Sequence, residues 1–271
     1  MYASSRHSLA QLTSELESRR SSVGFELVAD ELYSACDLLG REKSLRQALS
    51  DSGRSAQNRG EIVQTIFGSK LSAPTVEILA SVARSRWSST DDLVEAVRTL
   101  ANQTAFMVAA NNGTLGTTED EIFRIGRAIS GSADLQSVLT NPAISGNTKA
   151  GIVSDLLAGK STATTQTVVG FTLSHLDGRR IDQAIDELVA LAAAQASRVV
   201  ASVRVARSLD EQLTDRMVRA LNDLTGQQVQ LNVVVDPSVL GGALVTINGE
   251  VIDGTIASRL AEARRTVVGK V

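Results

Sequence analysis

Apolar residues recur at steps of three and four along most of the chain, which is the spacing of amphipathic helices. The clearest stripe begins at Phe25 and continues through Val28, Leu32, Ala35 and Leu39. Asn111-Asn112-Gly113 interrupts the pattern, and the glycine is expected to end a helix in the left-handed conformation. Further helices are predicted for a leader within Ser4–Ser22 and for Ile62–Phe67, Val76–Ala83 and Leu93–Val108.

The helical pattern repeats after a shift of 90 residues. Asp30-Glu31 then falls on Asp120-Glu121, and the apolar pairs include Leu45 with Leu135, Leu49 with Leu139, Ile62-Val63 with Ile152-Val153 and, after a two-residue adjustment, Leu93 with Ile181. Periodicity alone would produce some of these pairs. It accounts less easily for the pairs Lys70 with Lys160 and Thr75 with Thr165.

Two tandem copies of one small helical bundle follow from this repeat. The first copy, with the leader, covers residues 1–112 and the second covers 113–197. Amphipathic helices of this length do not bury their apolar faces alone, so each block is expected to close on itself.

From residue 198 the pattern becomes one of alternation, which predicts strands at Val199–Val205 and Val229–Val235. A helix between them is expected to begin with a capping box, Ser208 to Glu211, and to end at Gly226. Ala243–Ile247 and Glu250–Asp253 form a predicted hairpin around Asn248-Gly249. A last helix is expected after Gly254-Thr255, with an apolar face formed by Ile256, Leu260, Ala263 and Val267. The predicted fold is mainly α: two tandem helical bundles followed by a small α/β domain at 198–271.

Composition and charge exclude several classes of protein. The 271 residues are 43 % hydrophobic and 3 % aromatic, with a net charge of −3. Residues 1–112 carry 12 basic and 13 acidic groups, 113–197 carry 6 and 9, and 198–271 carry 9 and 8, so no segment has the basic surface that nucleic-acid binding needs. No apolar run approaches the ~20 residues that span a bilayer, so we expect a soluble chain without direct membrane insertion.

Candidate catalytic features all have simpler structural explanations. Gly159-Lys160-Ser161-Thr162 is similar to the end of a phosphate-binding loop, but Ser154 stands where that motif needs a glycine. We therefore expect a surface loop between two helices. His175 lies near a helix end and is expected to be a surface or capping residue, and with His7 and Cys36 it cannot complete a zinc set. Cys36 alone excludes an intrachain disulfide and is expected to be buried.

The remaining polar and glycine motifs also predict structure rather than chemistry. Asp91-Asp92 and Asp182 lie at helix starts, where carboxylates complement the helix dipole. Gly241-Gly242 does not begin a nucleotide-binding Gly-x-Gly-x-x-Gly motif, and tight backbone geometry explains it. We expect no catalytic, metal-binding or cofactor-binding residues and no cofactor. The chain is not expected to be an enzyme by itself.

The run from Leu231 to Leu260 closely resembles the C-terminal signature of the delta subunit of bacterial F-type ATP synthase, the oligomycin-sensitivity-conferring protein of mitochondria. The residues that carry the resemblance are Asp236, Pro237, Gly241, Gly242, Gly249, Asp253, Gly254, Arg259 and Leu260. With the preceding helical block, the resemblance covers the last ~160 residues. The extra block at 1–112 and its Arg86-Trp87 pair are similar to the elongated actinobacterial form.

The resemblance implies a non-catalytic role in the peripheral stalk, at the cytoplasmic face of the cell membrane and held there by the complex. Helical bundles of the family bind amphipathic N-terminal helices of alpha subunits, and the C-terminal domain binds the end of the b subunit. Trp87 is a candidate partner contact, and a core position is an equal alternative. Two other functions stay open: a stand-alone helical scaffold that binds amphipathic helices, and a nucleotide-dependent enzyme that uses Lys160-Ser161-Thr162.

Overall fold

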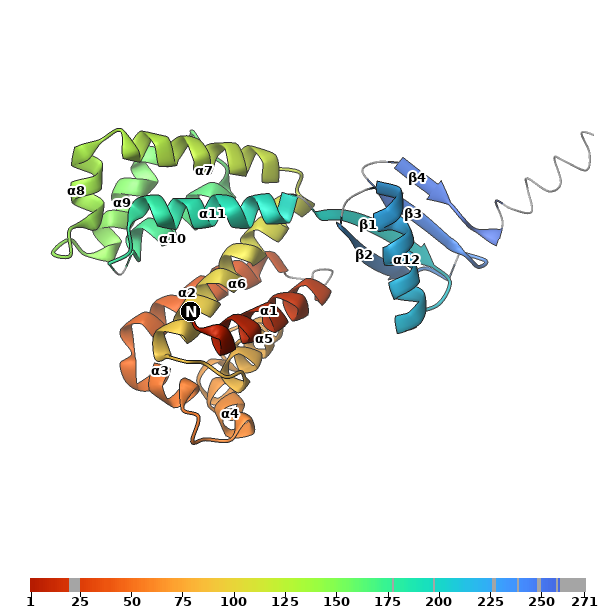
Figure 1. The fold of residues 1–271 in the computed structure, drawn as a ribbon, viewed down its shortest axis with the longest axis horizontal. Coiled ribbons are helices and arrows are strands. Elements are labelled where there is room, and N and C mark those ends of the chain that lie inside the picture. Colours follow the sequence, from red (N-terminus) through yellow and green to blue (C-terminus); the bar gives the residue numbers. More distant parts are fainter. Residues whose placement is uncertain are drawn as a thin grey trace, which may run out of the picture. The chain divides into compact units, whose positions relative to one another are not determined.

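The computed structural model describes residues 1–19, 25–176, 178–196, 198–225, 228–237, 239–247, 250–256 and 258. It divides into two compact units, Met1–Gln195 and Ala196–Val271. The helices of the first unit are α1 (Ala3–Ser18), α2 (Phe25–Arg41), α3 (Lys43–Ser50), α4 (Ala56–Phe67), α5 (Ala73–Arg84), α6 (Thr90–Asn111), α7 (Leu115–Ser130), α8 (Ala133–Thr140), α9 (Gly146–Leu157), α10 (Ala163–Ser174) and α11 (Ile181–Ala196) (Figure 1). The second unit contains β1 (Arg198–Val205), α12 (Glu211–Thr225), β2 (Gln228–Val235), β3 (Ala243–Ile247) and β4 (Glu250–Asp253). This confirms the mainly α fold with a small α/β end.

The internal repeat is confirmed by the positions of the helices. α3, α4 and α5 become α8, α9 and α10 after a shift of 90 residues at both ends of each helix. Their caps repeat as well: the Ser55 hydroxyl accepts a hydrogen bond from the N–H of Asn58, and the Ser145 hydroxyl accepts one from the N–H of Thr148. Each hydroxyl satisfies a helix N–H that has no partner within its helix.

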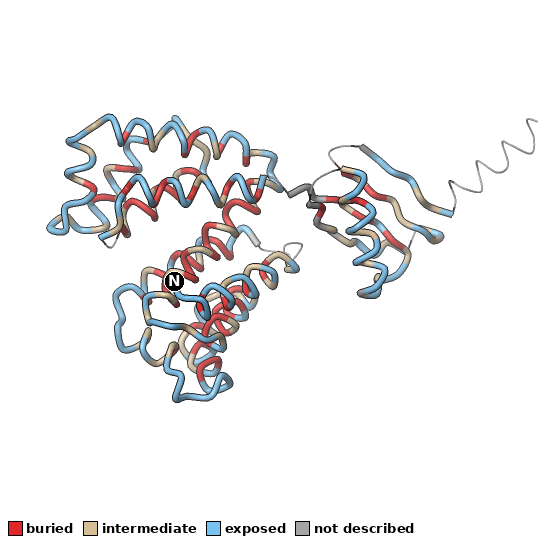
Figure 2. Tube along the Cα trace, in the orientation of Figure 1, coloured by how far each residue is buried: buried red, intermediate tan, exposed pale blue. Residues whose placement is uncertain are grey.

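One helix, α6, takes part in the packing of both copies. It contacts α1, α2, α3 and α5 in the first copy, and α7 and α10 in the second. Shifting α1 by 90 residues gives 93–108, a range inside α6, so α6 serves as the last helix of one copy and the first helix of the next. Its C-terminal half is buried at Phe106, Met107 and Ala109, and buried positions follow most of its length (Figure 2).

The cores of the two copies are joined through α6. Their buried apolar residues form one continuous cluster, which runs from Leu12 to Ala192. The physical reason is the shared helix: a 22-residue helix is long enough to bury one stretch of its surface in each copy. The division of the helical unit at residue 112 stays a prediction.

The C-terminal unit is a four-stranded sheet in the order β2-β1-β3-β4. β1 pairs in parallel with β2, whereas the pairs β1–β3 and β3–β4 are antiparallel. α12 connects the parallel pair and packs against β2. The core of this unit lies on one face of the sheet and consists of Ala201, Val203, Val205, Leu221, Val229, Val245 and Ile247.

The predicted capping box of α12 is wrong. The helix begins at Glu211, and the N–H of Leu213 donates to Oδ1 of Asp210 at 2.7 Å. Asp210 is therefore the capping residue in place of Ser208. The carboxylate forms a charge-assisted hydrogen bond, and Leu209 packs against the core and so holds the chain at the helix entrance.

Candidate partner-binding surfaces

The signature residues within the described part of the C-terminal unit gather at one end of the sheet. Asp236-Pro237 follows β2, and Gly241-Gly242 precedes β3. Asp253 is the last residue of β4, and Gly254 comes directly after it. In the strand register, Val205 at the end of β1 is opposite both the last residue of β2 and the first of β3. These six signature residues thus form one structural joint.

Backbone contacts at this joint explain the paired glycines. Gly242 has φ +79°, and a Cβ atom there would lie 2.4 Å from the carbonyl oxygen of Gly254. Gly241 has φ +142°, and its carbonyl accepts a hydrogen bond from Ile256 N–H at 2.9 Å. Only glycine allows this conformation together with such a close approach of two chain segments. The prediction of tight backbone geometry is confirmed.

Asp253 stabilises the turn that leaves β4. Its Oδ1 accepts the N–H of Thr255 at 2.9 Å. Hydrogen bonds from the hydroxyl and the N–H of Thr255 lower the pKa of the Asp253 carboxyl. Gly249, Arg259, Leu260 and most of the predicted last helix lie outside the described residues.

The segment that is similar to a phosphate-binding loop has a structural role, as expected. Gly159 to Thr162 connects α9 to α10, and Gly159 has φ +68°. The Thr162 hydroxyl accepts a hydrogen bond from the N–H of Thr165 and so caps α10. Cys36 is buried in α2, 2 % exposed, with Sγ 3.7 Å from the carbonyl oxygen of Val94.

Two glutamates at equivalent positions tie α2 to α5 and α7 to α10. Glu31 accepts the N–H of Ser72 at 2.9 Å, the Ser72 hydroxyl at 2.5 Å and the Thr75 hydroxyl. Glu121 accepts the N–H of Thr162 at 2.8 Å, its hydroxyl at 3.0 Å and the Thr165 hydroxyl at 2.6 Å. Each carboxylate lies at the N-terminus of a helix, where the dipole favours negative charge.

The surroundings favour the ionised form of both glutamates. Burial raises the pKa of each carboxyl, but the hydrogen bonds from the Ser72, Thr75, Thr162 and Thr165 groups outweigh it, and the net pKa is lowered for both. Arg124 adds a smaller lowering at Glu121. The sequence showed these residues only as coincidences in the repeat, because their contact depends on two helices about 40 residues apart.

A polar and aromatic cluster joins the two copies. The rings of Tyr33 and Phe171 lie 4.6 Å apart, and the ring of His175 stacks on Phe171 at 4.2 Å. His175 Nε2 lies 3.1 Å from Oδ1 of Asp37. His175 is the C-cap residue of α10, so the capping prediction is confirmed.

The contact between the copies was missed at the sequence level. A usable signal was the difference between repeats: Phe171 and His175 correspond to Ser81 and Ser85 of the first copy. Aromatic residues replace serines where one copy packs against the other.

Trp87 lies in the connection between α5 and α6. Its indole N–H donates to the carbonyl oxygen of Val82 at 2.8 Å, and the half-buried ring packs against the core of the helical unit. A contact of Trp87 with a partner stays a prediction.

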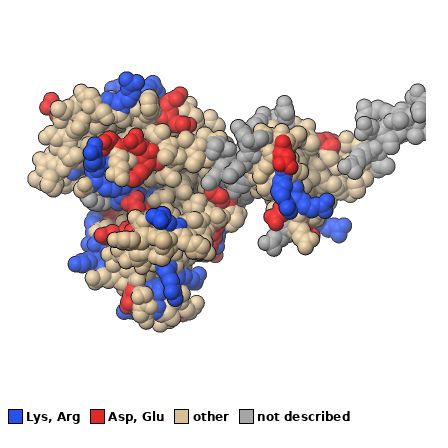
Figure 3. Space-filling model, viewed as in Figure 1, with Lys and Arg blue, Asp and Glu red and all other residues tan. Residues whose placement is uncertain are grey.

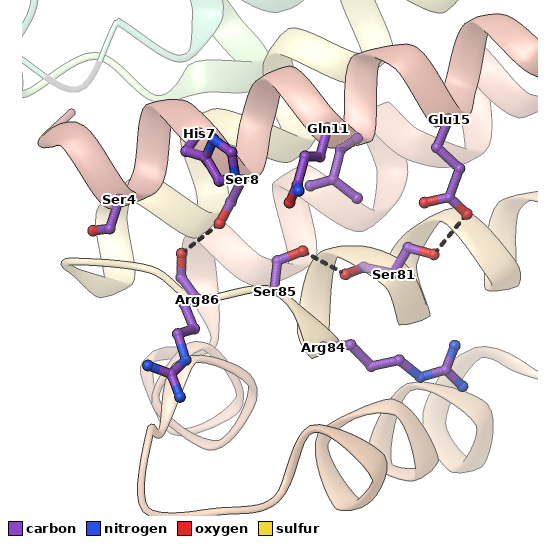
Figure 4. Close-up of a pocket in the computed structure, with 10 residues that line it drawn as sticks. Ser4, His7, Ser8, Gln11, Glu15, Ser81, Arg84, Ser85 and Arg86 are labelled. Atoms are coloured by element: carbon purple, nitrogen blue, oxygen red, sulfur yellow. Dashed lines mark hydrogen bonds between the residues drawn. The ribbon is translucent and has the colours of Figure 1, made fainter.

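The α1–α5 hollow lies between α1 and the end of α5 and has a volume of about 520 Å³ (Figure 4). Most of the residues that line it are polar in type. The Ser8 hydroxyl donates to the carbonyl oxygen of Arg86 at 2.9 Å, and the Ser81 hydroxyl donates to Oε1 of Glu15 at 3.0 Å. These bonds hold α1 against α5, and His7, Gln11 and Arg84 are among the other residues of the lining (Figure 4).

The α7–α9 groove has a volume of about 250 Å³ and a different character. Arg124 and Lys160 contribute positive charge to it, and Glu121 lies among its lining residues. The apolar lining consists of Ile125, Ala128, Leu156 and Leu157.

The comparisons with known proteins agree with the C-terminal signature. A family model described as ATP synthase delta (OSCP) subunit matches residues 103–267. The chain belongs to this family. The matched range begins inside α6 and includes the second helical copy and the C-terminal unit.

Relatives in the family match the first copy as well. The ATP synthase subunit delta of Streptomyces griseus is 36 % identical over 271 residues, which cover 99 % of this chain and 100 % of the relative. The protein of the same name from Rhodococcus opacus is 36 % identical over 274 residues, 98 % and 99 % of the two chains, and that of Thermobifida fusca is 34 % identical over 269 residues, 99 % and 100 %. The chain is thus the elongated, actinobacterial-like form with a duplicated helical domain.

A solved structure is also similar, at a low level. It is the cryo-EM structure of the Toxoplasma gondii mitochondrial ATP synthase hexamer, with a TM-score of 0.28 and 18 % identity, covering 63 % of this chain and 97 % of the matched chain. At that TM-score the likeness adds nothing to the fold assignment. Within the described ranges, no helix has both the length and the apolar character needed to cross a bilayer.

Proposed function

We propose that the chain is a peripheral-stalk subunit of a proton-translocating F-type ATP synthase, which ties the catalytic head to the stalk formed by the b subunit. Its membership of the delta family, with relatives that match nearly its whole length, is the observation that carries this proposal. In this role the chain is not catalytic. It is peripheral to the membrane, at the cytoplasmic face, and is held there by the complex.

The shared helix and continuous core of the helical unit suit a subunit that must resist mechanical force. A stator must hold the head still while the central shaft turns, so it has to resist torque without deforming. Because α6 belongs to both copies and one core runs through them, the copies cannot separate without breaking a helix or exposing buried apolar surface. Close-packed interiors transmit strain well, which favours this unit as a stiff connector.

The two units offer surfaces for different partners. We assign the helical unit to the amphipathic N-terminal helices of the alpha subunits, which fit grooves between helices. We assign the C-terminal unit to the end of the b subunit. This unit exposes several large apolar side chains that suit a protein contact: Leu213, Leu224, Val234, Val235, Leu240, Val251, Ile252 and Ile256.

Charge on the visible face of the helical unit is mixed, with basic and acidic groups side by side (Figure 3). Such a surface favours recognition by shape and apolar contact, with charge adding specificity, over attraction to a strongly charged polymer.

Hydrogen exchange of the full chain tests the proposal. We expect a peptide with the N-terminal sequence of the alpha subunit to protect amides in the helical unit. A peptide from the end of the b subunit should protect amides within 198–258. A chain whose exchange is unchanged by both peptides would contradict the proposal.

A further inference from the structure

The contact between the two helical copies contains a histidine and a carboxylate that face each other. His175 follows α10 of the second copy, and its Nε2 lies 3.1 Å from Oδ1 of Asp37 on α2 of the first copy. The equivalent positions in the other copy hold Ser85 and Arg127, which cannot form such a pair. The Asp37–His175 pair is therefore not part of the repeated architecture and belongs to the contact between the copies.

Both ring nitrogens of His175 lie next to oxygens that accept hydrogen bonds. Nε2 is beside the Asp37 carboxylate, and Nδ1 is 3.0 Å from the carbonyl oxygen of Phe171. The Ser174 hydroxyl, 2.9 Å from Nδ1, donates to the same carbonyl. A protonated imidazolium donates at both nitrogens, whereas a neutral ring has one N–H. A neutral ring keeps its bond to Asp37 only if the Ser174 hydroxyl turns toward Nδ1, so the arrangement favours the charged ring.

Aromatic packing holds the ring in this position. The His175 ring stacks on Phe171 with centroids 4.2 Å apart and an interplanar angle of 17°, and Phe171 lies 4.6 Å from Tyr33 of the first copy. A cation over an aromatic face is attracted by the electrons of that ring, so the stacking also favours the charged histidine. The Tyr33 hydroxyl donates to Oδ1 of Asn102, and burial raises the pKa of its phenol, which favours the neutral form.

Other charged groups around the pair come from three segments. On α2, Arg41 forms a salt bridge with Asp37. Beyond α10, the Arg179 guanidinium donates to the His175 carbonyl oxygen at 3.2 Å and lies 3.6 Å from Oε1 of Glu95 on α6, which offsets its charge. The side chains of Asp37 and His175 are 29 % and 27 % exposed, so water screens their attraction only in part.

We propose that the Asp37–His175 pair is a pH-sensitive link between the two copies, strong when the His175 ring is protonated and weak when it is neutral. Histidine ordinarily titrates near pH ~6.5, so the link responds to pH around neutrality. A folded chain that binds this proton more tightly than the unfolded chain is stabilised at acid pH and loses that stabilisation as the pH rises. The link does not depend on the proposed function. Only its consequence does, since a stalk subunit with this contact is stiffer at slightly acid pH.

An NMR titration of the full chain tests the inference without altering the pair. The chain has two histidines, and His7 is exposed on α1, so it serves as an internal reference. The variant His7→Gln assigns the two sets of ring signals. We expect His175 to keep its proton to a higher pH than His7. A titration midpoint for His175 at or below that of His7 would overturn the inference.

Carboxylate variants identify the group that holds the proton. Asp37→Asn should lower the midpoint of His175 toward that of His7. Asp30→Asn is the matched control, because Asp30 is exposed on the same helix seven residues earlier, and it should leave the midpoint unchanged. Asp177 lies outside the described residues, and Asp177→Asn measures its share. If either of these two variants shifts the midpoint as far as Asp37→Asn, the assignment to Asp37 is wrong.

A double-mutant cycle measures the strength of the link. Asp37→Asn, His175→Gln and the double variant are unfolded with urea at about pH 6 and about pH 8, and the helical signal is followed. We expect the two residues to be coupled about fivefold in the unfolding equilibrium constant at the lower pH, and much less at the higher pH. Equal coupling at both pH values contradicts the inference and leaves the stalk role unaffected. Should a variant fail to fold, the titration of the unaltered pair still decides.

Discussion

At the scale of single residues, polar groups hold the helical bundles together at equivalent points. Glu31 and Glu121 each bind the N-terminus of a helix that is distant in sequence. The repeated Asp-Glu and Thr residues were visible in the sequence, but the hydrogen bonds between them were not. Periodicity reports which face of a helix is buried and does not say which polar groups meet across that face.

Glu121→Gln tests the role of this carboxylate. Charged hydrogen bonds contribute about 2 kcal/mol each, so we expect a loss of that order in the free energy of unfolding at pH 7. The folded-state pKa of Glu121 is lowered from 4.5, so its stabilisation is present above pH 4.5 and is lost as the pH falls through the folded pKa. Thermal unfolding at pH 7 and at acid pH should show the difference between variant and parent shrinking.

Glu119→Gln is the control for that experiment, since Glu119 lies on the same helix, away from these bonds. An equal effect of Glu121→Gln at both pH values would contradict the assigned role.

Substitution of Trp87 distinguishes a role in the core from a contact with a partner, because the first affects stability and the second affects assembly. Its ring packs on the core and its N–H bonds to Val82, so Trp87→Ala should lower the free energy of unfolding by about 2–3 kcal/mol. Trp87→Phe keeps the ring packing and should cost about 1 kcal/mol. A variant that assembles poorly at an unchanged unfolding temperature would instead identify Trp87 as a partner contact.

Gly242→Ala tests the joint at the end of the sheet. The substitution requires a positive φ for alanine and places Cβ against the Gly254 carbonyl, so we expect a loss of about 1–3 kcal/mol in the C-terminal unit. Gly170→Ala is the control, because Gly170 lies in α10 with open space around it, and alanine should stabilise that helix. Equal unfolding temperatures for the two variants would contradict this account of the signature.

At the scale of elements, α6 determines how the duplicated halves are joined. The helix and strand positions followed from apolar spacing, and the 90-residue shift predicted the equivalence of α3, α4 and α5 with α8, α9 and α10. The sequence did not predict that α6 packs in both copies, because a stripe of apolar residues on one helix can pack against helices of one bundle or of two. The start of α12 was displaced by two residues, because Asp210 and Ser208 are both good capping residues and the sequence does not rank them.

Gln103→Pro tests whether α6 couples the copies. Proline in the middle of the helix removes a backbone hydrogen bond and costs about 3 kcal/mol or more. We expect calorimetry to show one cooperative transition for the helical unit of the parent, and a split or strongly lowered transition for the variant. Gln103→Ala keeps the helix and loses the hydrogen bond that Gln103 Oε1 accepts from the Thr13 hydroxyl, so it should cost only about 1 kcal/mol and leave a single transition. A single transition at the parent temperature in Gln103→Pro would exclude the coupling.

At the scale of the whole molecule, the chain combines a fused double bundle with a small sheet-based unit. The family could be predicted from the C-terminal run, because Asp236-Pro237 and Gly241-Gly242 meet at one joint and the backbone there tolerates few alternatives. The partner surfaces could not be predicted residue by residue, since Leu156 and the core residues beside it share one apolar pattern. Only the structure shows that Leu156 is exposed whereas Val153 and Leu157 are buried.

Reconstitution of coupling is the most direct test of the stalk role. Membranes that carry the synthase without this chain should lose the catalytic head on washing, or hydrolyse ATP without pumping protons. Adding back the purified chain should restore both head binding and ATP-driven proton pumping. Membranes that retain the head and pump at the full rate in its complete absence would contradict the account.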